Sequence, residues 1–275
     1  MVLEIIVSAV NMQDFSDILS KTRHFSKNTK LLIINQTRQK KSGLKEEALF
    51  LDSKNIRVLS FNEIGLSKSR NQGIKNATGD ICLISDSDVE FKNNLETIIT
   101  DAFANNPEAD IITFQIETPD HKKFKKYPKK EKWHNIFSIM KVSSIEIAFR
   151  RKAIQENNLL FDENFGLNGN IFPFGGEENI FLYDCLKKGL KIKYIPKPIV
   201  IHKKESTGKK LDYETLFTKG ALFARIFNHY CWIVNILFII KKIPELKPLN
   251  LCKALKQMFS GSKKWFEFVE KGDEI

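Results

Sequence analysis

A chain of 275 residues can bury one substantial core with a smaller appendage, and its 42% hydrophobic and 28% charged residues exclude a largely disordered protein. Forty-four lysines and arginines against 33 aspartates and glutamates leave a net charge of +11, so we expect an anionic partner or surface. The four cysteines are widely spaced without a CxxC pair, which argues against a disulfide framework or a zinc site and fits a cytoplasmic chain.

The amino terminus reads MVLEIIVSAV, with no basic segment ahead of its apolar residues. We therefore expect a buried first strand there and not a signal peptide. No apolar run reaches 18 residues, and the longest, Tyr230 to Ile240, is about half as long as a membrane-spanning helix. The sequence predicts a protein that does not cross a membrane.

Apolar runs alternate with polar, helix-like stretches through the first 120 residues. The predicted strands are Leu3 to Val10, Lys30 to Asn35, Ile56 to Phe61, Ile81 to Ser85 and Asp110 to Ile116. The predicted helices are Asp14 to Phe25, Leu44 to Leu51, Leu66 to Asn76 and Asn94 to Asn105. This alternation is typical of right-handed βαβ units, so we expect an α/β fold with a mainly parallel, Rossmann-like sheet flanked by helices.

A lysine-rich segment from His121 to Trp133 follows, with seven lysines that we interpret as a solvated loop. After it the pattern is mixed. We expect a strand at Ser144 to Phe149, a helix from Glu177 to Lys188, and two short strand-like pieces broken by Pro196 and Pro198. The predicted carboxyl-terminal helices are Tyr213 to Asn228, Cys231 to Lys241 and Leu251 to Phe259.

Two aspartates follow the predicted strand Ile81 to Ser85. Residues two apart in an extended segment project the same way, so Asp86 and Asp88 can face one cation at the carboxyl end of the strand. Open α/β sheets bind their ligands at that end. Unpaired carboxylates in a crevice would repel each other, whereas a divalent cation carrying a diphosphate would neutralise both. The pattern predicts a metal-nucleotide site, and Mn²⁺ or Mg²⁺ suits such ligands.

The segment Gly65 to Phe91 resembles the donor-binding half of family 2 glycosyltransferases of the GT-A fold. The matching features are a small-residue helix with an Arg-Asn pair, a Gly-Asp pair, an apolar strand and an Asp-X-Asp, found here at Arg70, Asn71, Gly79, Asp80, Ile81 to Ser85, Asp86 and Asp88. The resemblance extends from Leu3 to about His202. It implies an inverting, metal-dependent transferase that moves a sugar from a nucleotide-diphosphate sugar, with UDP-sugars the leading donors.

The resemblance also implies an acceptor and a division of the chain. The acceptor is expected to be a hydroxyl of a glycan or lipid-linked glycan in surface polysaccharide biosynthesis. Residues 1–120 are expected to form the nucleotide-sugar-binding half of the GT-A domain, 121–210 its acceptor-binding and catalytic half, and 211–275 a helical extension.

Three residues are candidate metal ligands. We expect Asp88 to bind the cation directly, and the resemblance implies that Asp86 contacts the ribose or reaches the metal through water. His202 follows a predicted strand near the end of the matching region, where relatives often complete the metal or diphosphate contact. A neutral imidazole can bind Mn²⁺, although a lone histidine is as often a surface or hydrogen-bonded residue.

The nucleotide is expected to contact four further residues by the same resemblance. Ser8 and Asn11 mark the end of the first strand, below the base, and Arg70 pairs with a base carbonyl or a neighbouring acid. Asn35 ends the second strand, where many relatives carry an aspartate for the uracil imide. Its amide can still donate and accept, but the change weakens the case for uridine.

The catalytic base is expected in FGGEENIF, where Glu177 and Glu178 begin a helix after two glycines. Glu178 stands where many relatives have the aspartate that acts as base. A carboxylate at a helix amino terminus stays ionised, as a base must. The alternative is that both glutamates only complement the helix dipole.

Other interpretations remain open from the sequence. The apolar carboxyl-terminal helices either pack on their own domain or lie on an anionic membrane beside a lipid-linked acceptor, at its cytoplasmic face. A sugar-phosphate nucleotidyltransferase usually has a glycine-rich, arginine-containing loop that SAVNMQD, at Ser8 to Asp14, lacks. A non-catalytic nucleic-acid- or glycan-binding protein is favoured only by net charge, and without a nucleic-acid motif we expect no nucleic-acid partner.

Overall fold

The computed structural model describes the chain except for residues 39–46, 51–54, 204–210, 247–248 and 273–275. The chain forms two compact units. The first comprises Met1–Phe161 and Phe181–Lys204, and the second comprises Asp162–Ile180 and Glu205–Ile275.

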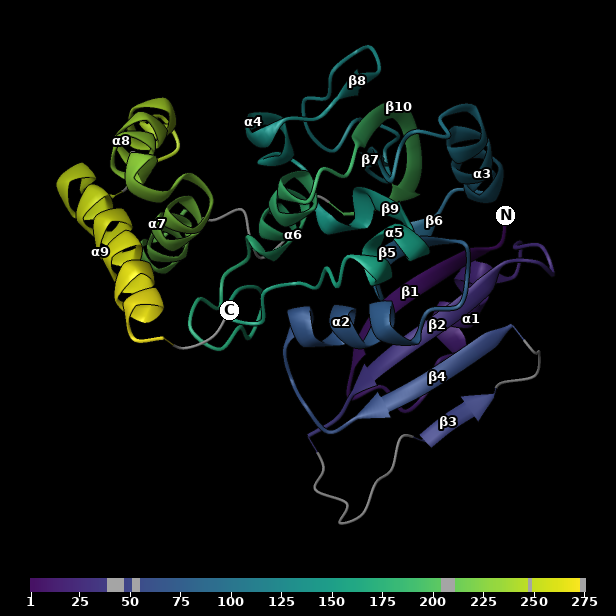
Figure 1. Ribbon diagram of the computed structural model, residues 1–275. Coiled ribbons are helices and arrows are strands. Elements are labelled where there is room, and N and C mark those ends of the chain that lie inside the picture. The colour runs from purple at the N-terminus through teal and green to yellow at the C-terminus, as the bar shows by residue number, and fades with distance from the viewer. Residues whose placement is uncertain (39–46, 51–54, 204–210, 247–248, 273–275) are drawn as a thin grey trace. The chain divides into compact units, whose positions relative to one another are not determined.

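A central sheet organises the first unit (Figure 1). Its strands run in the order β3-β4-β2-β1-β5-β9-β7-β10-β6, and β8 pairs with β10. Neighbours β4, β2, β1 and β5 are parallel, as are β7 and β10, whereas β9 runs antiparallel between β5 and β7. The strand bounds are β1 Leu3–Val10, β2 Lys30–Gln36, β3 Glu47–Phe50, β4 Ile56–Phe61, β5 Ile81–Asp86, β6 Glu90–Phe91, β7 Ile111–Glu117, β8 Lys132–Trp133, β9 Ile147–Arg150 and β10 Ile192–Ile201.

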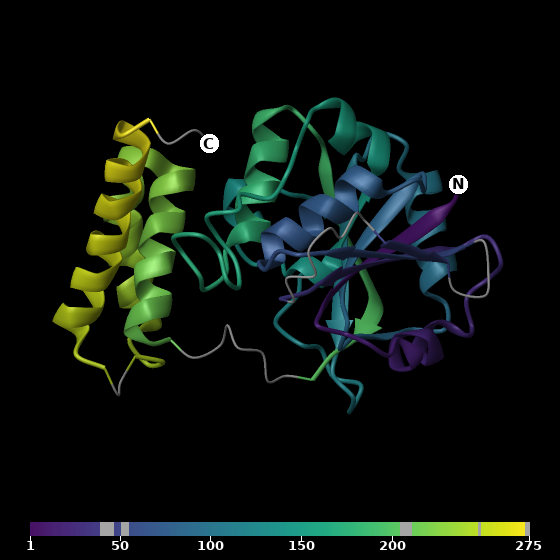
Figure 2. The ribbon, with the colours of Figure 1, turned by 90° about the horizontal axis from the view of Figure 1, so that it is seen from below.

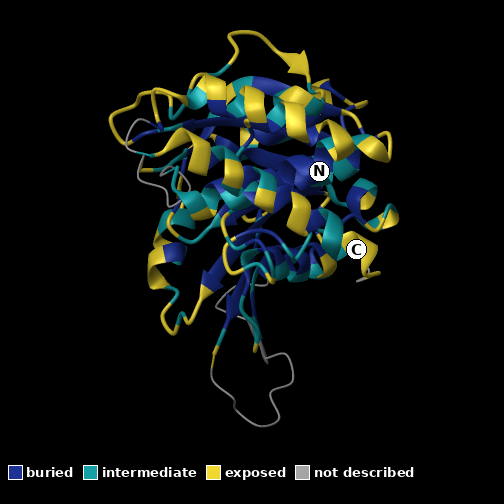
Figure 3. Ribbon diagram, turned by 90° about the vertical axis from the view of Figure 1, so that its left-hand side faces the viewer, coloured by how far each residue is buried: buried dark blue, intermediate teal, exposed yellow. Residues whose placement is uncertain are grey.

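Helices cover both faces of this sheet because its inner strands are apolar on both sides. In β1, Ile5 packs in a cluster with residues of α1 (Ser16–Thr22) and α3 (Leu95–Asn105). Ile6 packs on the opposite face with residues of α2, α5 and α6. These three helices span Leu66–Asn76, Arg151–Glu156 and Glu177–Lys187. The strands are accordingly buried, whereas the outer helix surfaces are exposed (Figure 3).

The second unit is built around α7 (Tyr213–Phe227), α8 (Cys231–Lys242) and α9 (Leu251–Glu270), which pack side by side (Figure 2). Asp212 caps α7 through the backbone N–H of Thr215, and Asn250 caps α9. A cluster of aromatic rings, Phe165, Phe172, Phe217 and Trp265, joins the segment before α6 to these helices.

Within the described residues, one helical run, Tyr213–Lys242, is long and apolar enough by length and composition to cross a membrane. Asn228, with φ of 50°, divides this run into α7 and α8. Most of the apolar side chains of α7, such as Leu216 and Phe223, are buried within the unit. Only 33% of the most apolar 18-residue window of this run is buried, and the core helix of a soluble protein meets the same criteria of length and composition.

Most predicted elements are confirmed, α2 to the residue, and four are corrected. Residues Ser144–Glu146 of the predicted strand Ser144 to Phe149 form a 3-10 helix, and β9 begins only at Ile147. Residues Glu47–Phe50 of the predicted helix Leu44 to Leu51 form strand β3, because they pair antiparallel with β4; the remainder lies outside the described residues. Pro196 and Pro198 do not break β10, since register shifts accommodate residues that lack an N–H donor. Helix α9 continues to Glu270, beyond the predicted end at Phe259.

Candidate functional site

Polar side chains gather where the parallel strands β1, β2 and β5 end. Ser8 of β1 lies opposite Asp86 of β5, and Asn35 of β2 lies opposite Ala9. Strand β10 runs in the same direction as β5, so its carboxyl end reaches the same edge of the sheet. We call this edge the carboxyl rim.

Asp88 and His202 form an ion pair at the carboxyl rim, with Oδ2 of Asp88 3.3 Å from Nε2 of His202. The hydrogen bond lowers the pKa of Asp88 and raises the pKa of His202. Nζ of Lys21 in α1 donates a hydrogen bond to the carbonyl oxygen of Ser87, 3.2 Å away, and so stabilises the turn that carries Asp88. The pair thus joins an anionic oxygen and an imidazole, which are both ligands for a divalent cation.

The reason for the position of Asp88 differs from the one predicted. Strand β5 ends at Asp86, and Ser87 and Asp88 form a turn, so strand alternation does not place the two carboxylates on one side. Asp88 instead meets His202 because β6 pairs with β10, with Glu90 opposite Ile201. Asp86 and Asp88 therefore have different partners.

Asp86 is held by Arg70, whose Nη2 lies 3.3 Å from Oδ1 of Asp86 and donates to Oγ of Ser144 at 2.8 Å. The guanidinium stacks over the ring of Phe161, and only 1% of Arg70 is exposed. Of the two pairings predicted for Arg70, the structure shows the one with a neighbouring acid. This buried guanidinium fixes the direction of the Asp86 carboxylate.

Asn35 and Asn11 shape the loop after β1. The amide of Asn35 accepts from the backbone N–H of Met12 at 3.0 Å and donates to its carbonyl at 2.8 Å. Asn11 has a positive φ of 51°, and its side chain accepts from the backbone of Arg38. Both polar groups of the Asn35 amide are therefore used within the protein.

Gln36, next to Asn35, is a residue that the sequence analysis missed. It is 1% exposed, and its Oε1 accepts from the backbone N–H of Gly65 at 3.2 Å. Its Nε2 and the Oγ of Ser8 are buried without a hydrogen-bond partner among the described residues. Unpaired buried donors are costly, so a ligand or water that completes them gains binding energy. The only signal in the sequence was an amide at the end of a strand.

The described residues include no cluster of three or more His, Cys, Asp or Glu side chains arranged to hold a metal ion. The pair formed by Asp88 and His202 nevertheless fits a cation that arrives with a nucleotide. Mg²⁺ and Mn²⁺ are commonly held by one or two protein ligands, with phosphate oxygens and water in the other positions. Lys203 is exposed beside His202, and Lys204 lies outside the described residues.

The predicted base lies in the second unit, at the start of α6. Gly175 and Gly176 precede the helix with φ of 85° and 93°, values that favour glycine. Glu177 is buried, and Glu178 is partly exposed. Desolvation lowers the pKa of Lys219, and the carboxylate of Glu178 opposes this shift, so the two charges attract each other. A carboxylate at this position is consistent with the role of a base.

Solved structures share this fold. The structure of S. aureus TarS 1–349 in complex with UDP-GlcNAc has a TM-score of 0.57 and 14% identity over 99% of this chain and 92% of that chain. The complex of S. aureus TarS 1–349 with UDP has a TM-score of 0.55 and 14% identity over 99% of this chain and 92% of that chain. The structure of S. aureus TarS has a TM-score of 0.56 and 13% identity over 98% of this chain and 55% of that chain. At such identities the likeness shows the fold alone.

A search of curated proteins finds no match. The family model described as "Glycosyl transferase family 2" matches residues 14–166, which is more than half of the chain. This match includes α2, β5 and the two aspartates of the carboxyl rim. The chain therefore belongs to glycosyl transferase family 2 and is a glycosyltransferase with a GT-A-like fold.

Proposed function

We propose that the protein is an inverting, metal-dependent glycosyltransferase that takes its sugar from a UDP-sugar. The observation that carries this proposal is the pair of Asp88 and His202, joined at the carboxyl rim from segments far apart in the chain. Asp86 lies in the same motif, held in place by Arg70. The similar structures with UDP-GlcNAc and UDP support a uridine nucleotide as the carrier.

Asp88 and His202 would hold Mn²⁺ or Mg²⁺, which when bound supplies Lewis-acid stabilisation to the departing diphosphate. Asp86 would accept a hydrogen bond from a ribose hydroxyl or would contact the cation through water. Ser8 and Gln36 offer unpartnered donors to the nucleotide. Asn35 and Asn11 act through the loop that they shape, since the Asn35 amide is already occupied by Met12.

Glu178 acts as the general base in this proposal. The acceptor hydroxyl oxygen attacks C1 of the sugar as its proton passes to Glu178, and the bond from C1 to the diphosphate oxygen breaks on the opposite side. One displacement with one base inverts the anomeric centre. The neighbouring Glu177 is buried and supports the start of α6. The acceptor is a hydroxyl of a glycan or lipid-linked glycan.

A thermal-shift series tests the donor and the metal together. The full chain is melted with UDP-GlcNAc, UDP-glucose or GDP-mannose, each with and without Mn²⁺. We expect a UDP-sugar to raise the Tm only when Mn²⁺ is present, because the diphosphate and the cation bind as a unit. Equal shifts with and without Mn²⁺, or a shift with GDP-mannose alone, would contradict the proposal.

We also propose that α8 lies on an anionic membrane surface. Ile233, Leu237 and Ile240 are each more than half exposed and follow one side of the helix. The opposite side, with Cys231 and Asn235, is buried in the second unit. Lysines end α8, and the net charge of +11 complements anionic lipid.

Flotation with vesicles of phosphatidylglycerol and phosphatidylcholine tests this contact. The variant I233S/L237S/I240S changes exposed side chains only, so it should fold normally and float less than the wild type. Vesicles of phosphatidylcholine alone should recruit both proteins poorly. Equal flotation of variant and wild type would show that α8 does not face the lipid.

A further inference from the structure

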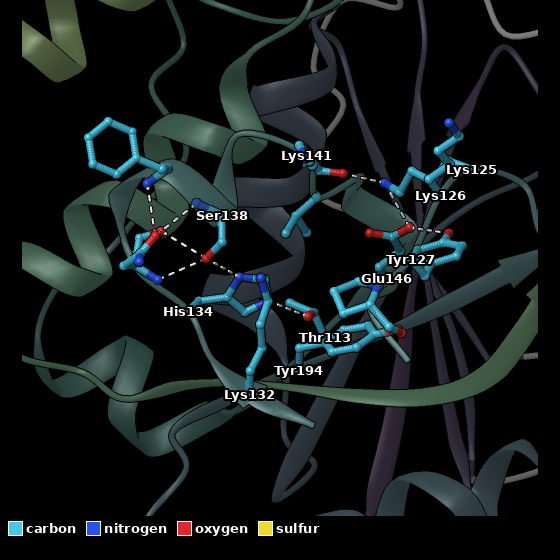
Figure 4. Close-up of a pocket in the computed structure, with 14 residues that line it drawn as sticks. Thr113, Lys125, Lys126, Tyr127, Lys132, His134, Ser138, Lys141, Glu146 and Tyr194 are labelled. Carbon is cyan, nitrogen blue, oxygen red and sulfur yellow. Dashed lines mark hydrogen bonds and ion pairs between the residues drawn. The ribbon is translucent and has the colours of Figure 1, made fainter. Parts of the chain in front are cut away.

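A cavity of about 510 Å³ lies in the first unit, and none of the residues described above at the carboxyl rim lines it (Figure 4). Thr113 of β7 and Tyr194 of β10, which are register partners, contribute to its wall. The rest comes from the lysine-rich segment, from α4 (Ile136–Ile139) and from the residues that follow it. Its volume is within the range of small-molecule sites, about 300–1,000 Å³.

One pair of charges in this cavity is already compensated. Nζ of Lys125 lies 2.8 Å from Oε1 of Glu146, which also accepts from the hydroxyl of Tyr127. The second oxygen of Glu146 accepts from the backbone N–H of Ser143 at 3.0 Å. Glu146 is 2% exposed, so this network is structural and adds no net charge.

Three further lysines line the cavity: Lys126, Lys132 and Lys141. All are exposed, and no carboxylate in the part of the chain that the structure describes pairs with them. The nearby Glu131 is bound to Lys193 at 3.1 Å. The cavity therefore carries an excess of three positive charges.

His134 is an uncharged residue of the cavity wall, and its pKa is shifted by the lysines around it. Its ring nitrogens lie 2.8 Å from Oγ1 of Thr113 and 2.9 Å from Oγ of Ser138. Burial, followed by the positive charges of Lys132 and Lys125, lowers the pKa of His134 to about 4. The imidazole is thus neutral near pH 7 and offers a fixed hydrogen-bonding ring.

Aromatic rings supply the uncharged part of the wall. Tyr127 and Tyr194 are parallel, with ring centroids 6.4 Å apart, and Phe137 is 70% exposed. Ring faces beside cations suit a ligand with an apolar or sugar-like body and an anionic group. Ammonium groups bind phosphate as point charges, and several around one cavity match a doubly charged group.

We propose that this cavity is a second ligand site, which binds a sugar phosphate through Lys126, Lys132 and Lys141. The site does not depend on the proposed donor chemistry, because none of its residues belongs to the carboxyl rim. It binds without a divalent cation, since the lysines supply the positive charge.

Lysine footprinting of the full chain tests the site in buffer with EDTA and without nucleotide. An amine-acetylating reagent is applied with glucose 6-phosphate as probe or glucose as control, and each lysine is quantified by mass spectrometry. We expect saturable protection of Lys126, Lys132 and Lys141 by glucose 6-phosphate and none by glucose. Absence of protection, or equal protection of Lys75, Lys152 and Lys188, would overturn the proposal.

Two triple variants that remove the same number of charges distinguish binding in the cavity from attraction by the net charge of the protein. K126Q/K132Q/K141Q should lower the affinity for glucose 6-phosphate at least about tenfold, since each charged hydrogen bond contributes appreciably. K75Q/K152Q/K188Q removes the same charge from exposed lysines outside the cavity and should bind as the wild type does. Equal losses in both variants would mean that binding reflects only the overall charge of the protein.

Discussion

Asp88 and His202 are 114 residues apart in the chain, yet Oδ2 of Asp88 lies 3.3 Å from Nε2 of His202. The antiparallel pairing of β6 with β10 brings them together, one just before β6 and the other just after β10. The pairing lowers the pKa of Asp88 and raises the pKa of His202, so each side chain favours the charged form of the other. When a divalent cation binds, the carboxylate and the neutral imidazole can both become its ligands in place of their direct ion pair.

A double-mutant cycle tests whether the pair binds a metal as a unit. Asp88→Asn should abolish the Mn²⁺-dependent binding of UDP-GlcNAc, and His202→Ala should weaken it by about 10- to 100-fold. Because both residues serve one cation, the double variant should be no worse than Asp88→Asn alone. Isothermal titration with and without Mn²⁺ measures each affinity.

The control for this cycle is Asp101→Asn, which neutralises an exposed aspartate of α3 outside the site. It should bind the donor as the wild type does. Mn²⁺-dependent donor binding that persists in Asp88→Asn and falls further when His202→Ala is added would indicate two independent contacts and would exclude a shared cation.

Glu178→Gln separates chemistry from donor binding. The amide cannot accept the acceptor proton, so kcat should fall by about 10²- to 10⁴-fold while the Kd for UDP-GlcNAc is unchanged. Glu108→Gln, at an exposed position of the first unit, should leave both quantities as they are. A rate for Glu178→Gln within twofold of the wild type would remove Glu178 from the role of base.

The sequence sufficed for features that depend on local pattern. Strands β1 and β5 and helix α2 follow from apolar periodicity, and the motif at Asp86 and Asp88 follows from its position at the carboxyl end of β5. The sequence predicts a helix where the edge strand β3 forms, because pairing with β4, and not the propensity of these residues, decides their conformation.

Contacts between distant segments could not be predicted. The pair of Asp86 with Arg70 was one of two alternatives, and the bonds from Asn35 to Met12 depend on how the loop after β1 folds back. Six of the seven lysines of the lysine-rich segment are exposed, as the predicted solvated loop requires, and Lys125 is the exception. Lys125 is instead bound to Glu146, which becomes visible only when residues 125 and 146 are placed in space.

His134 makes the stability of the first unit depend on pH. Its pKa is about 4 in the folded protein and near 6.5 when unfolded, so the unfolded chain binds the proton more readily. Its contribution is therefore complete above pH ~6.5 and is lost as the pH falls toward 4. By linkage, the free energy of unfolding should fall by about 2 kcal/mol between pH 7 and pH 5 from this residue alone.

Urea unfolding of the wild type and of His134→Gln at these two pH values measures that contribution. The variant has no imidazole at this position, so its loss of stability between pH 7 and pH 5 should be smaller by about 2 kcal/mol. His121→Gln, at an exposed histidine, should keep the dependence of the wild type. Equal pH dependence in all three proteins would show that His134 titrates normally.

Gly220 and Gly261 allow close packing of α7 and α9 in the second unit. A Cβ at Gly220 would lie 1.9 Å from the carbonyl oxygen of Met258, and one at Gly261 would lie 1.9 Å from that of Phe217. Between the helices, Oγ of Ser262 donates to the carbonyl of Gly220 at 2.8 Å. These contacts join two backbones, so no side chain can move aside to accommodate an added methyl group.

Helix propensity alone predicts the opposite sign for Gly220→Ala, since alanine in a helix interior is more favourable by about 1 kcal/mol. The clash with Met258 should prevail because the helices would have to separate, and overpacking costs typically ~1–3 kcal/mol or more. We therefore expect the free energy of unfolding of the second unit to fall by at least about 1 kcal/mol. Circular dichroism during urea unfolding measures it, with Glu214→Ala at an exposed position of α7 as control. A more stable Gly220→Ala would mean that α7 and α9 do not approach each other so closely.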